Sequence, residues 1–349
     1  MLLLLIGLPV VCPAGEVQYN LKAVDNYILP GYTQLSERTQ KLAEQTEHFC
    51  RQPDPDDLGR LRESYHLAMD SWQFMQPIRL GPSEQELRSY RLQFWPDKRQ
   101  SVSRHLAELL DKADAEALKA DAFAKGSVAV QGFSALERLL FASDLEAGAY
   151  SSTEAGQYRC RVMVAITRNL ARIAREMTDE WQSGDASHRQ LVASSATGNA
   201  VYADSTEVSG RLFNGLYTQL ELMLDQKLRA PLGPSVERSR GNRSESWRSG
   251  RSLRNLAHNL DGIRALIHTA FLSRLLDPPL SRRIETQLEQ CEQVLARIDI
   301  PLRQAVKAPQ QRSRVEALVT ALSSLKTTLT GELASALEIP IGFNSLDGD

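Results

Sequence analysis

The sequence predicts an all-α protein, built as two packed helical bundles of about four helices each. Leu, Ala, Gln, Glu and Arg, which suit helices, dominate its 349 residues. Long alternating runs of Val, Ile and Thr, which strands would need, are missing from the sequence. Apolar residues instead recur at steps of three and four, so each helix has one face to bury against other helices.

Successive helices are expected along the chain, because the apolar stripes are separated by proline, glycine and small polar residues. Ser83 and Glu86 follow a Gly-Pro turn with the spacing of a capping box, which marks a helix start. The predicted helical segments cover residues 21–49, 57–76, 102–110, 126–142, 162–181, 208–223, 253–271, 280–298 and 311–336.

A run of small and polar residues at 183–206 is the best candidate for a domain boundary. We therefore predict an N-terminal helical bundle at residues 16–185 and a C-terminal helical bundle at residues 186–349. The net charge of −2 gives no overall field that would favour nucleic acid, so we expect no nucleic-acid partner.

The apolar N-terminus predicts an exported protein. Residues 1–15 suit a signal peptide cleaved after Ala14 or Gly15, and the run is shorter than the roughly 20 residues that cross a bilayer. A buried core helix is the alternative. Cys12 is a candidate lipid anchor, which would be the protein's one contact with a membrane.

Three further cysteines, Cys50, Cys160 and Cys291, lie far apart and lack the spacing of a zinc or redox motif. Two interpretations are open. An oxidising compartment would allow one disulfide with one thiol left over, and otherwise all three are buried thiols.

The segment QGFSALERLLF at residues 131–141 places Gly132, Ser134 and Glu137 on a predicted helix. Ser134 and Glu137 are three residues apart and therefore share a helix face. Gly132 in mid-helix costs about 1 kcal/mol relative to alanine, which a close packing contact or a ligand would explain. Glu137 lies among apolar residues, and a buried carboxylate needs an arginine, other donors or a cation. A solvated face is the alternative.

An arginine- and serine-rich segment at residues 239–252 offers such partners. It contains Arg243, Glu245, Arg248 and Ser252, and arginine binds carboxylates and other anions through paired hydrogen bonds. A solvated linker is the alternative interpretation, against which the tryptophan in the segment argues.

Familiar catalytic motifs are absent from the sequence, including the H-E-x-x-H of zinc peptidases and the G-x-S-x-G of serine hydrolases. Among the six histidines, His105 has a carboxylate three residues later, Glu108, on the same helix face. We interpret this pair as structural or solvated, because such short matches arise often in helical sequence.

Four places in the sequence together resemble the imelysin-like proteins, which form peptidase family M75. They are YILPGYTQL at 27–35, SWQFMQPIRLGP and FWPD at 71–82 and 94–97, GFSALE at 132–137, and NRSESWRSGRSLRNL with the tail IGFNSLDGD at 242–256 and 341–349. GFSALE is similar to the family's G-x-H-x-x-E, with Ser134 in the place of histidine. The resemblance implies two helical bundles, a motif near their interface, a periplasmic or lipid-anchored location and a role in iron uptake.

The change to Ser134 weakens any metal site, because imidazole binds transition metals strongly and a serine hydroxyl binds them weakly. Iron or another divalent metal remains an option, with Glu137 and Asp347 or Asp349 as weak ligands, but the sequence identifies no definite cofactor.

We predict a periplasmic, non-enzymatic binding protein that acts in iron uptake through an inter-domain cleft. Its expected partners are iron-uptake components of the envelope or a small ligand. The alternatives are a metal-dependent peptidase of family M75 and a structural scaffold of the envelope.

Overall fold

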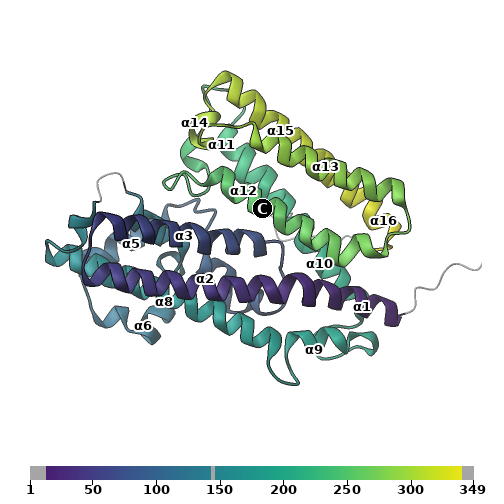
Figure 1. Cartoon of the computed structure of the whole chain (residues 1–349), viewed down its shortest axis with the longest axis horizontal. Coiled ribbons are helices and arrows are strands. Elements are labelled where there is room, and N and C mark those ends of the chain that lie inside the picture. The colour runs from purple at the N-terminus through teal and green to yellow at the C-terminus, as the bar shows by residue number, and fades with distance from the viewer. Residues whose placement is uncertain (1–12, 143–145, 340–349) are drawn as a thin grey trace, which may run out of the picture.

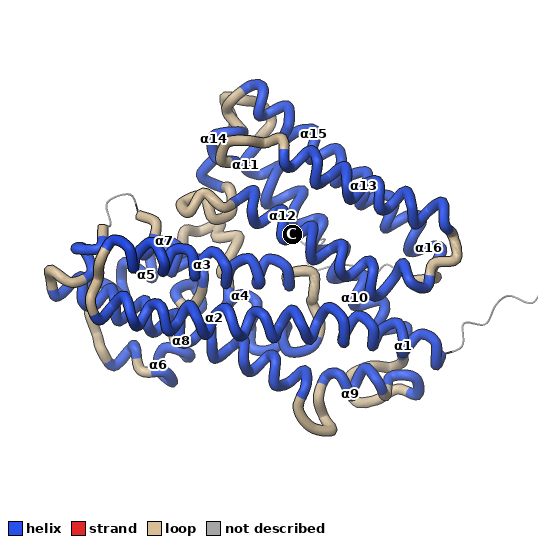
Figure 2. The backbone as a smooth tube through the Cα atoms, viewed as in Figure 1, coloured by secondary structure: helices blue, strands red, loops and turns tan. Residues whose placement is uncertain are grey.

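The computed structural model describes residues 13–142 and 146–339, and all regular structure in these ranges is helical (Figure 1, Figure 2). The predicted all-α class is therefore confirmed. Cys12, Asp347 and Asp349, together with most of the predicted signal peptide, lie outside the described residues.

The α-helices among the described residues of the first half are α1 (Pro13–Ala23), α2 (Leu29–Arg51), α3 (Pro55–Met75), α4 (Arg88–Leu92), α5 (Ser101–Lys112), α6 (Ala120–Lys125), α7 (Phe133–Leu140), α8 (Glu154–Gln182) and α9 (His188–Ala193). Short 3₁₀ segments are η2 (Gly81–Leu87), η3 (Glu116–Leu118), η4 (Val128–Val130) and η5 (Ala147–Tyr150). The long helix α2 packs along both α3 and α8, and α7 packs against α8. The predicted apolar stripe of α8 is buried against these neighbours.

The second half contains α10 (Ser205–Glu221), α11 (Ala230–Leu232), α12 (Ser252–Leu266), α13 (Pro278–Ala296), α14 (Leu302–Ala305), α15 (Pro309–Thr327) and α16 (Ala334–Ala336). Helix α13 packs along α15 and contacts α12. The other 3₁₀ turns are η6 (Ser195–Thr197), η8 (Gly241–Arg243) and η10 (Leu272–Arg274). The π-helical segments are η1 (Val24–Ile28) in the first half, and η7 (Leu222–Arg229), η9 (Ile267–Phe271) and η11 (Thr328–Leu333) in the second.

The two halves lie side by side and share one apolar core (Figure 1). Helix α3 packs along α12, and α1 lies against α9 and α10. The run at 183–206 is not a bare linker, because it includes the short helix α9. The boundary near residue 185 remains a prediction.

Two local predictions were wrong. The expected helix at 126–142 is broken into η4 and α7, because the backbone is extended at Gly132. Ser83 caps no helix: its hydroxyl donates to the carbonyls of Ile78 and Leu80, and Glu86 lies in a left-handed turn (φ 49°). A turn replaces the α-helix start that the capping box requires.

A disulfide joins Cys50 at the end of α2 to Cys160 on α8, while Cys291 is a buried free thiol. The structure therefore agrees with the interpretation of one disulfide and one thiol left over. Among the helices within residues 13–142 and 146–339, none has both the length and the apolar character that a membrane crossing needs.

Candidate functional site

Helix α7 begins where two chain segments touch. Gly132 precedes its first residue, and a Cβ atom on Gly132 would collide with the carbonyl oxygens of Arg91 and Leu92. The glycine is therefore explained by close backbone packing rather than by a position inside a helix. This contact fixes α7 against the end of α4.

The hydroxyl of Ser134 donates a hydrogen bond to the carbonyl oxygen of Phe94 at 3.1 Å. One turn later, Arg138 donates to the carbonyl oxygen of Ser134 at 3.2 Å and to the hydroxyl of Ser103 at 3.0 Å. Ser134 is thus a hydrogen-bond donor, as predicted, but its acceptor is the neighbouring backbone. It ties α7 to the stretch that follows α4.

Glu137 is buried and reaches from α7 to the second half of the chain. One of its carboxylate oxygens accepts hydrogen bonds from the backbone N–H of Ser249 at 2.9 Å and from the Ser249 hydroxyl at 2.8 Å. Burial raises the pKa of Glu137, while Ser249 and the nearby positive charges of Arg248 and Arg138 oppose that rise. The carboxylate is therefore held in place by neutral donors.

The arginine- and serine-rich segment is folded rather than solvated. Glu245 is almost fully buried and forms an ion pair with Lys227 of η7, with 2.9 Å between Lys227 Nζ and Glu245 Oε2. The side-chain amides of Gln93 and Asn255 donate to the same carboxylate at 2.8 and 2.7 Å. Ser252 donates its hydroxyl to the backbone carbonyl of Glu245. Glu245 and Ser252 therefore shape the segment from inside and do not face Glu137.

Arg243 and Arg248 face the cleft described next. Arg243 is exposed, and Arg248 is half-buried with its guanidinium 4.2 Å from the centre of the Trp247 ring. Arg303 of α14 lies over the same ring at 4.3 Å. Burial lowers the pKa of Arg248, and the charge of Glu137 opposes this shift. Of these arginines, Arg248 acts on Glu137 through its charge, and the hydrogen bonds of the carboxylate come from Ser249.

A cleft of about 680 Å³ opens between α7, the stretch after α4 and the arginine-rich segment. Among the described residues, its carboxylates are Asp97 and Glu137, and Asp97 accepts hydrogen bonds from the backbone N–H groups of Ser101 and Val102. The described cations that line the cleft outnumber them: Lys98, Arg138, Arg240, Arg243 and Arg248.

The sequence predicted that Gly132, Ser134 and Glu137 would lie opposite Arg243, Glu245, Arg248 and Ser252. The structure brings Ser134, Glu137, Arg243 and Arg248 together in this cleft, whereas Gly132, Glu245 and Ser252 do not line it.

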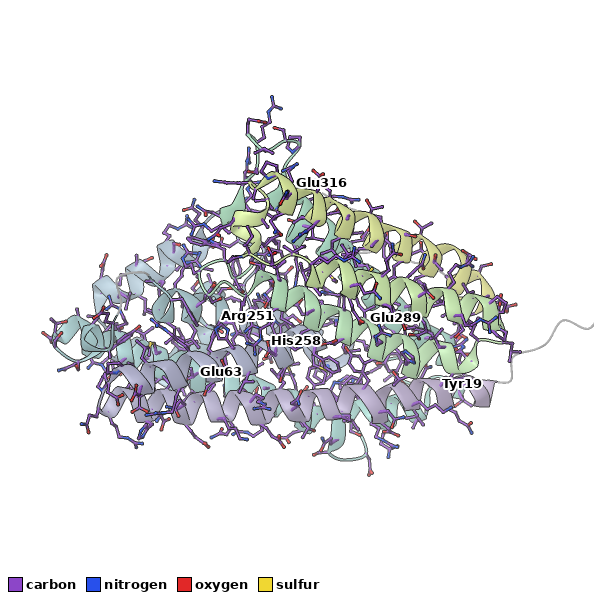
Figure 3. The ribbon with its side chains drawn as sticks, turned by 45° about the horizontal axis from the view of Figure 1, so that its top comes forward. Tyr19, Glu63, Arg251, His258, Glu289 and Glu316 are labelled. Atoms are coloured by element: carbon purple, nitrogen blue, oxygen red, sulfur yellow. A yellow bond between two sulfur atoms is a disulfide. The ribbon has the colours of Figure 1, made fainter. Side chains whose placement is uncertain are left out.

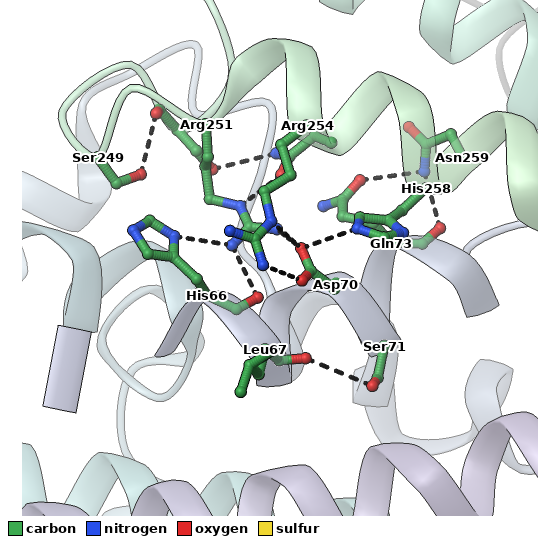
Figure 4. A network of polar contacts seen from close by, with 12 residues as sticks. His66, Leu67, Asp70, Ser71, Gln73, Ser249, Arg251, Arg254, His258 and Asn259 are labelled. Atoms are coloured by element: carbon green, nitrogen blue, oxygen red, sulfur yellow. Dashed lines mark hydrogen bonds and ion pairs between the residues drawn. The ribbon is translucent and has the colours of Figure 1, made fainter. Parts of the chain in front are cut away.

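A second contact between the halves, which the sequence did not predict, is centred on Asp70 of α3 (Figure 4). Asp70 forms ion pairs with Arg251 and Arg254, and it lies 3.2 Å from Nε2 of His258. Figure 3 shows Arg251 and His258 from another side. Arg251 also donates to the backbone carbonyl of His66 at 2.9 Å. The arginine-rich composition was a signal for ion pairing, but it did not identify the partner.

The pKa values of His258 and Asp70 shift in the direction of charge pairing, whereas that of His66 shifts toward the neutral form. The hydrogen bonds that His258 donates to the carboxylates of Asp261 and Asp70 raise its pKa to about 9. Burial by itself raises the pKa of Asp70, but the bonds from His258 and Arg254 bring it below its usual value. Burial, aided by the charge of Arg251, lowers the pKa of His66 to about 4.

The family model described as Imelysin matches residues 28–329, which is most of the chain. The chain belongs to the imelysin family.

Relatives of this imelysin agree with the assignment. It is 21% identical over 319 residues to iron-regulated protein A of Synechococcus elongatus, covering 88% of this chain and 82% of that protein. Its fold matches the crystal structure of an imelysin-like protein from Psychrobacter arcticum with a TM-score of 0.77 at 20% identity, covering 94% of this chain and 97% of the other. A structure from Parabacteroides distasonis matches with a TM-score of 0.73 at 15% identity, over 90% and 93% of the two chains.

Of the metal ligands predicted for this imelysin, only Glu137 lies within the residues that the structure describes. Across residues 13–142 and 146–339, no three His, Cys, Asp or Glu side chains gather closely enough to hold a metal ion. Asp347 is not among these residues. His105 lies 2.6 Å from the hydroxyl of Ser127, and Glu108 pairs with Lys112, so this histidine and carboxylate have separate partners.

Proposed function

We propose that this imelysin is an exported, non-enzymatic binding protein that serves iron uptake and takes an anionic ligand into the Glu137 cleft. One observation carries the proposal: among the residues that the structure describes, five cationic side chains line the cleft against two carboxylates, and both carboxylates already accept hydrogen bonds from backbone N–H groups. A ligand with several carboxylates would accept paired hydrogen bonds from the guanidinium groups of the cleft arginines.

The proposed role in iron uptake rests on sequence similarity, because a relative that aligns with most of this chain is named as an iron-regulated protein. Export is supported by the apolar N-terminus and by the Cys50–Cys160 disulfide, since disulfides persist in oxidising compartments such as the periplasm. An anionic chelate of ferric iron combines these features, because its carboxylates suit the arginines while the iron needs no ligand from the protein.

Titration calorimetry with citrate, with ferric citrate and with ferric iron lacking a chelator tests the proposal. We expect binding of the two citrate forms, and affinity about tenfold or more weaker in the variant Arg243→Gln/Arg248→Gln, because charge-assisted bonds are lost. The matched control is Arg99→Gln, an exposed arginine beside the cleft that does not line it.

Three outcomes would overturn the proposal. Tight stoichiometric binding of a metal without citrate, with peptide cleavage that Glu137→Ala abolishes, would favour the M75 peptidase, and Ser134→His would then strengthen the metal site. Equal citrate affinity in wild type and the double arginine variant would exclude the cleft. Loss of stability alone in Glu137→Ala, with all binding intact, would favour a structural scaffold.

A further inference from the structure

A second hollow, which we call the α8 groove, is lined by residues from the end of α2 and the first half of α8. Helices α2 and α8 lie side by side in Figure 1. It has a volume of about 740 Å³ and shares no lining residue with the Glu137 cleft. Pockets of this size hold small molecules. Neither the family relationship nor the proposed function uses it.

The charge of the α8 groove differs from that of the whole protein. The chain has a net charge of −2, yet the described residues that line this groove include five arginines and no aspartate or glutamate. The arginines are Arg51, Arg161, Arg168, Arg172 and Arg175. Four of them follow one face of α8, opposite the stripe that this helix buries in the core.

Neighbouring carboxylates neutralise part of this charge. Arg168 pairs with Glu47, and Arg172 pairs with Glu176. In the part of the chain that the structure describes, no carboxylate lies within ion-pair distance of Arg51 or Arg161. Arg161 instead lies over the ring of Tyr158, with 5.2 Å between guanidinium and ring centre.

The disulfide brings these two arginines together. Arg51 directly follows Cys50 and Arg161 directly follows Cys160, and the Cα atoms of the two cysteines are 5.6 Å apart. Both arginine side chains line the groove beside this covalent bond. An anion in this part of the groove would find two guanidinium groups as hydrogen-bond donors.

Part of the α8 groove is apolar, although Ser151, Gln157 and Asn169 also line it. The apolar part includes Leu118 of η3, Phe123 of α6, and Val164 and Ala165 of α8. Val164 and Ala165 remain partly exposed, and they lie one helical turn beyond Arg161. A ligand that filled the groove would therefore place an anionic group at the disulfide and an apolar body between α6 and α8.

We propose that the α8 groove binds a single-chain anionic amphiphile, such as a medium-chain carboxylate, with its head group on Arg51 and Arg161. The apolar wall supplies hydrophobic burial, and the two arginines supply charge-assisted hydrogen bonds to the head group. The disulfide acts as a positioning element for the head-group site.

Titration calorimetry of the full chain with decanoate tests this proposal, with acetate and decyltrimethylammonium as matched ligands that lack the chain or carry the opposite charge. We expect saturable, one-to-one binding of decanoate only. The variant Arg51→Gln/Arg161→Gln should weaken decanoate binding about tenfold or more. Ala165→Asp should weaken it similarly, because it puts a negative charge in the apolar wall.

The control variant Arg282→Gln/Arg297→Gln removes two exposed arginines of the second half, and its decanoate affinity should equal that of the wild type. Circular dichroism checks that each variant is folded. Arg243→Gln/Arg248→Gln should also leave decanoate binding intact, which separates this groove from the Glu137 cleft. Equal binding of the anionic and cationic amphiphiles, unchanged affinity in both groove variants, or binding of an acidic peptide in place of decanoate would overturn the proposal.

Discussion

Two carboxylates of the first half, Glu137 on α7 and Asp70 on α3, contact neighbouring parts of the second half in opposite ways. Glu137 accepts hydrogen bonds from the neutral donors of Ser249, and its pKa is raised, chiefly by burial. Asp70 is bound by two arginines and a histidine, and its pKa is lowered. Asp70 therefore forms a charged contact between the two halves, whereas Glu137 is a buried carboxylate that lines a cationic cleft.

The largest effect is expected from Asp70→Asn. The Arg251 side chain is only 1% exposed, and the variant leaves it as a buried cation without a carboxylate. Removing one partner of a buried ion pair costs about 3–5 kcal/mol, and the more exposed Arg254 contributes less. We expect the free energy of unfolding, measured with urea, to fall by about 3 kcal/mol.

The matched control for this variant is Asp261→Asn. Asp261 is exposed and contacts only His258 among the residues around Asp70, so its loss should cost less than about 1 kcal/mol. If the two variants lost equal stability, Asp70 would not be the main link between α3 and α12.

A smaller effect is expected from pH through His258. Its folded-state pKa of about 9 lies above the unfolded value of about 6.5, so it stabilises the fold below pH ~6.5 and loses that contribution as pH rises through about 9. Asp70, Asp261 and Arg254 are the charged groups around it. Because the side chain is 31% exposed, we expect a change of about 1 kcal/mol.

Urea unfolding at about pH 6 and about pH 9.5 measures this change in the wild type and in His258→Gln. The variant should lose less stability between the two values, because glutamine does not titrate. Identical losses in both proteins would assign the pH dependence to other groups.

The smallest effect is expected from Glu137→Gln. Because the pKa of Glu137 is raised in the folded state, its ionised carboxylate lowers the stability of the fold above that pKa. Glutamine removes this charge but keeps an oxygen that accepts the hydrogen bond from Ser249. The free energy of unfolding at neutral pH should stay within about 1 kcal/mol of the wild type, or rise. A loss as large as that of Asp70→Asn would make the two contacts equivalent.

The control Glu137→Leu has a similar volume but no acceptor. It leaves the N–H and hydroxyl of Ser249 without their partner and should cost about 1–3 kcal/mol. The difference between the glutamine and leucine variants measures the hydrogen bonds separately from the charge.

Most helices could be predicted from the sequence because the spacing of apolar residues is a local property. The segments 57–76 and 280–298 agree closely with α3 and α13. The prediction failed where a local pattern met a tertiary contact. Gly132 looked like a residue inside a helix, and only the packing of its backbone against Arg91 and Leu92 shows why a glycine stands there.

The candidate site was predictable in its residue types but not in its pairings. The sequence indicated that Glu137 needs a partner and that an arginine-rich segment could provide one. The partner in the structure is Ser249, while Arg251 pairs with Asp70. Composition fixes the charge of a segment, but the docking of the two halves decides which side chain reaches which carboxylate.

By itself, the sequence determined the all-α class, the resemblance to imelysins and the absence of histidine at Ser134, because each depends on residues close together in the chain. Tertiary structure alone decided the Cys50–Cys160 disulfide and the groove beside it, since these join residues 110 positions apart. It also decided that Glu137 accepts its hydrogen bonds from Ser249 and not from the arginines that line the same cleft. Long-range contacts of this kind follow from helix packing, which a periodic pattern predicts only as a buried face.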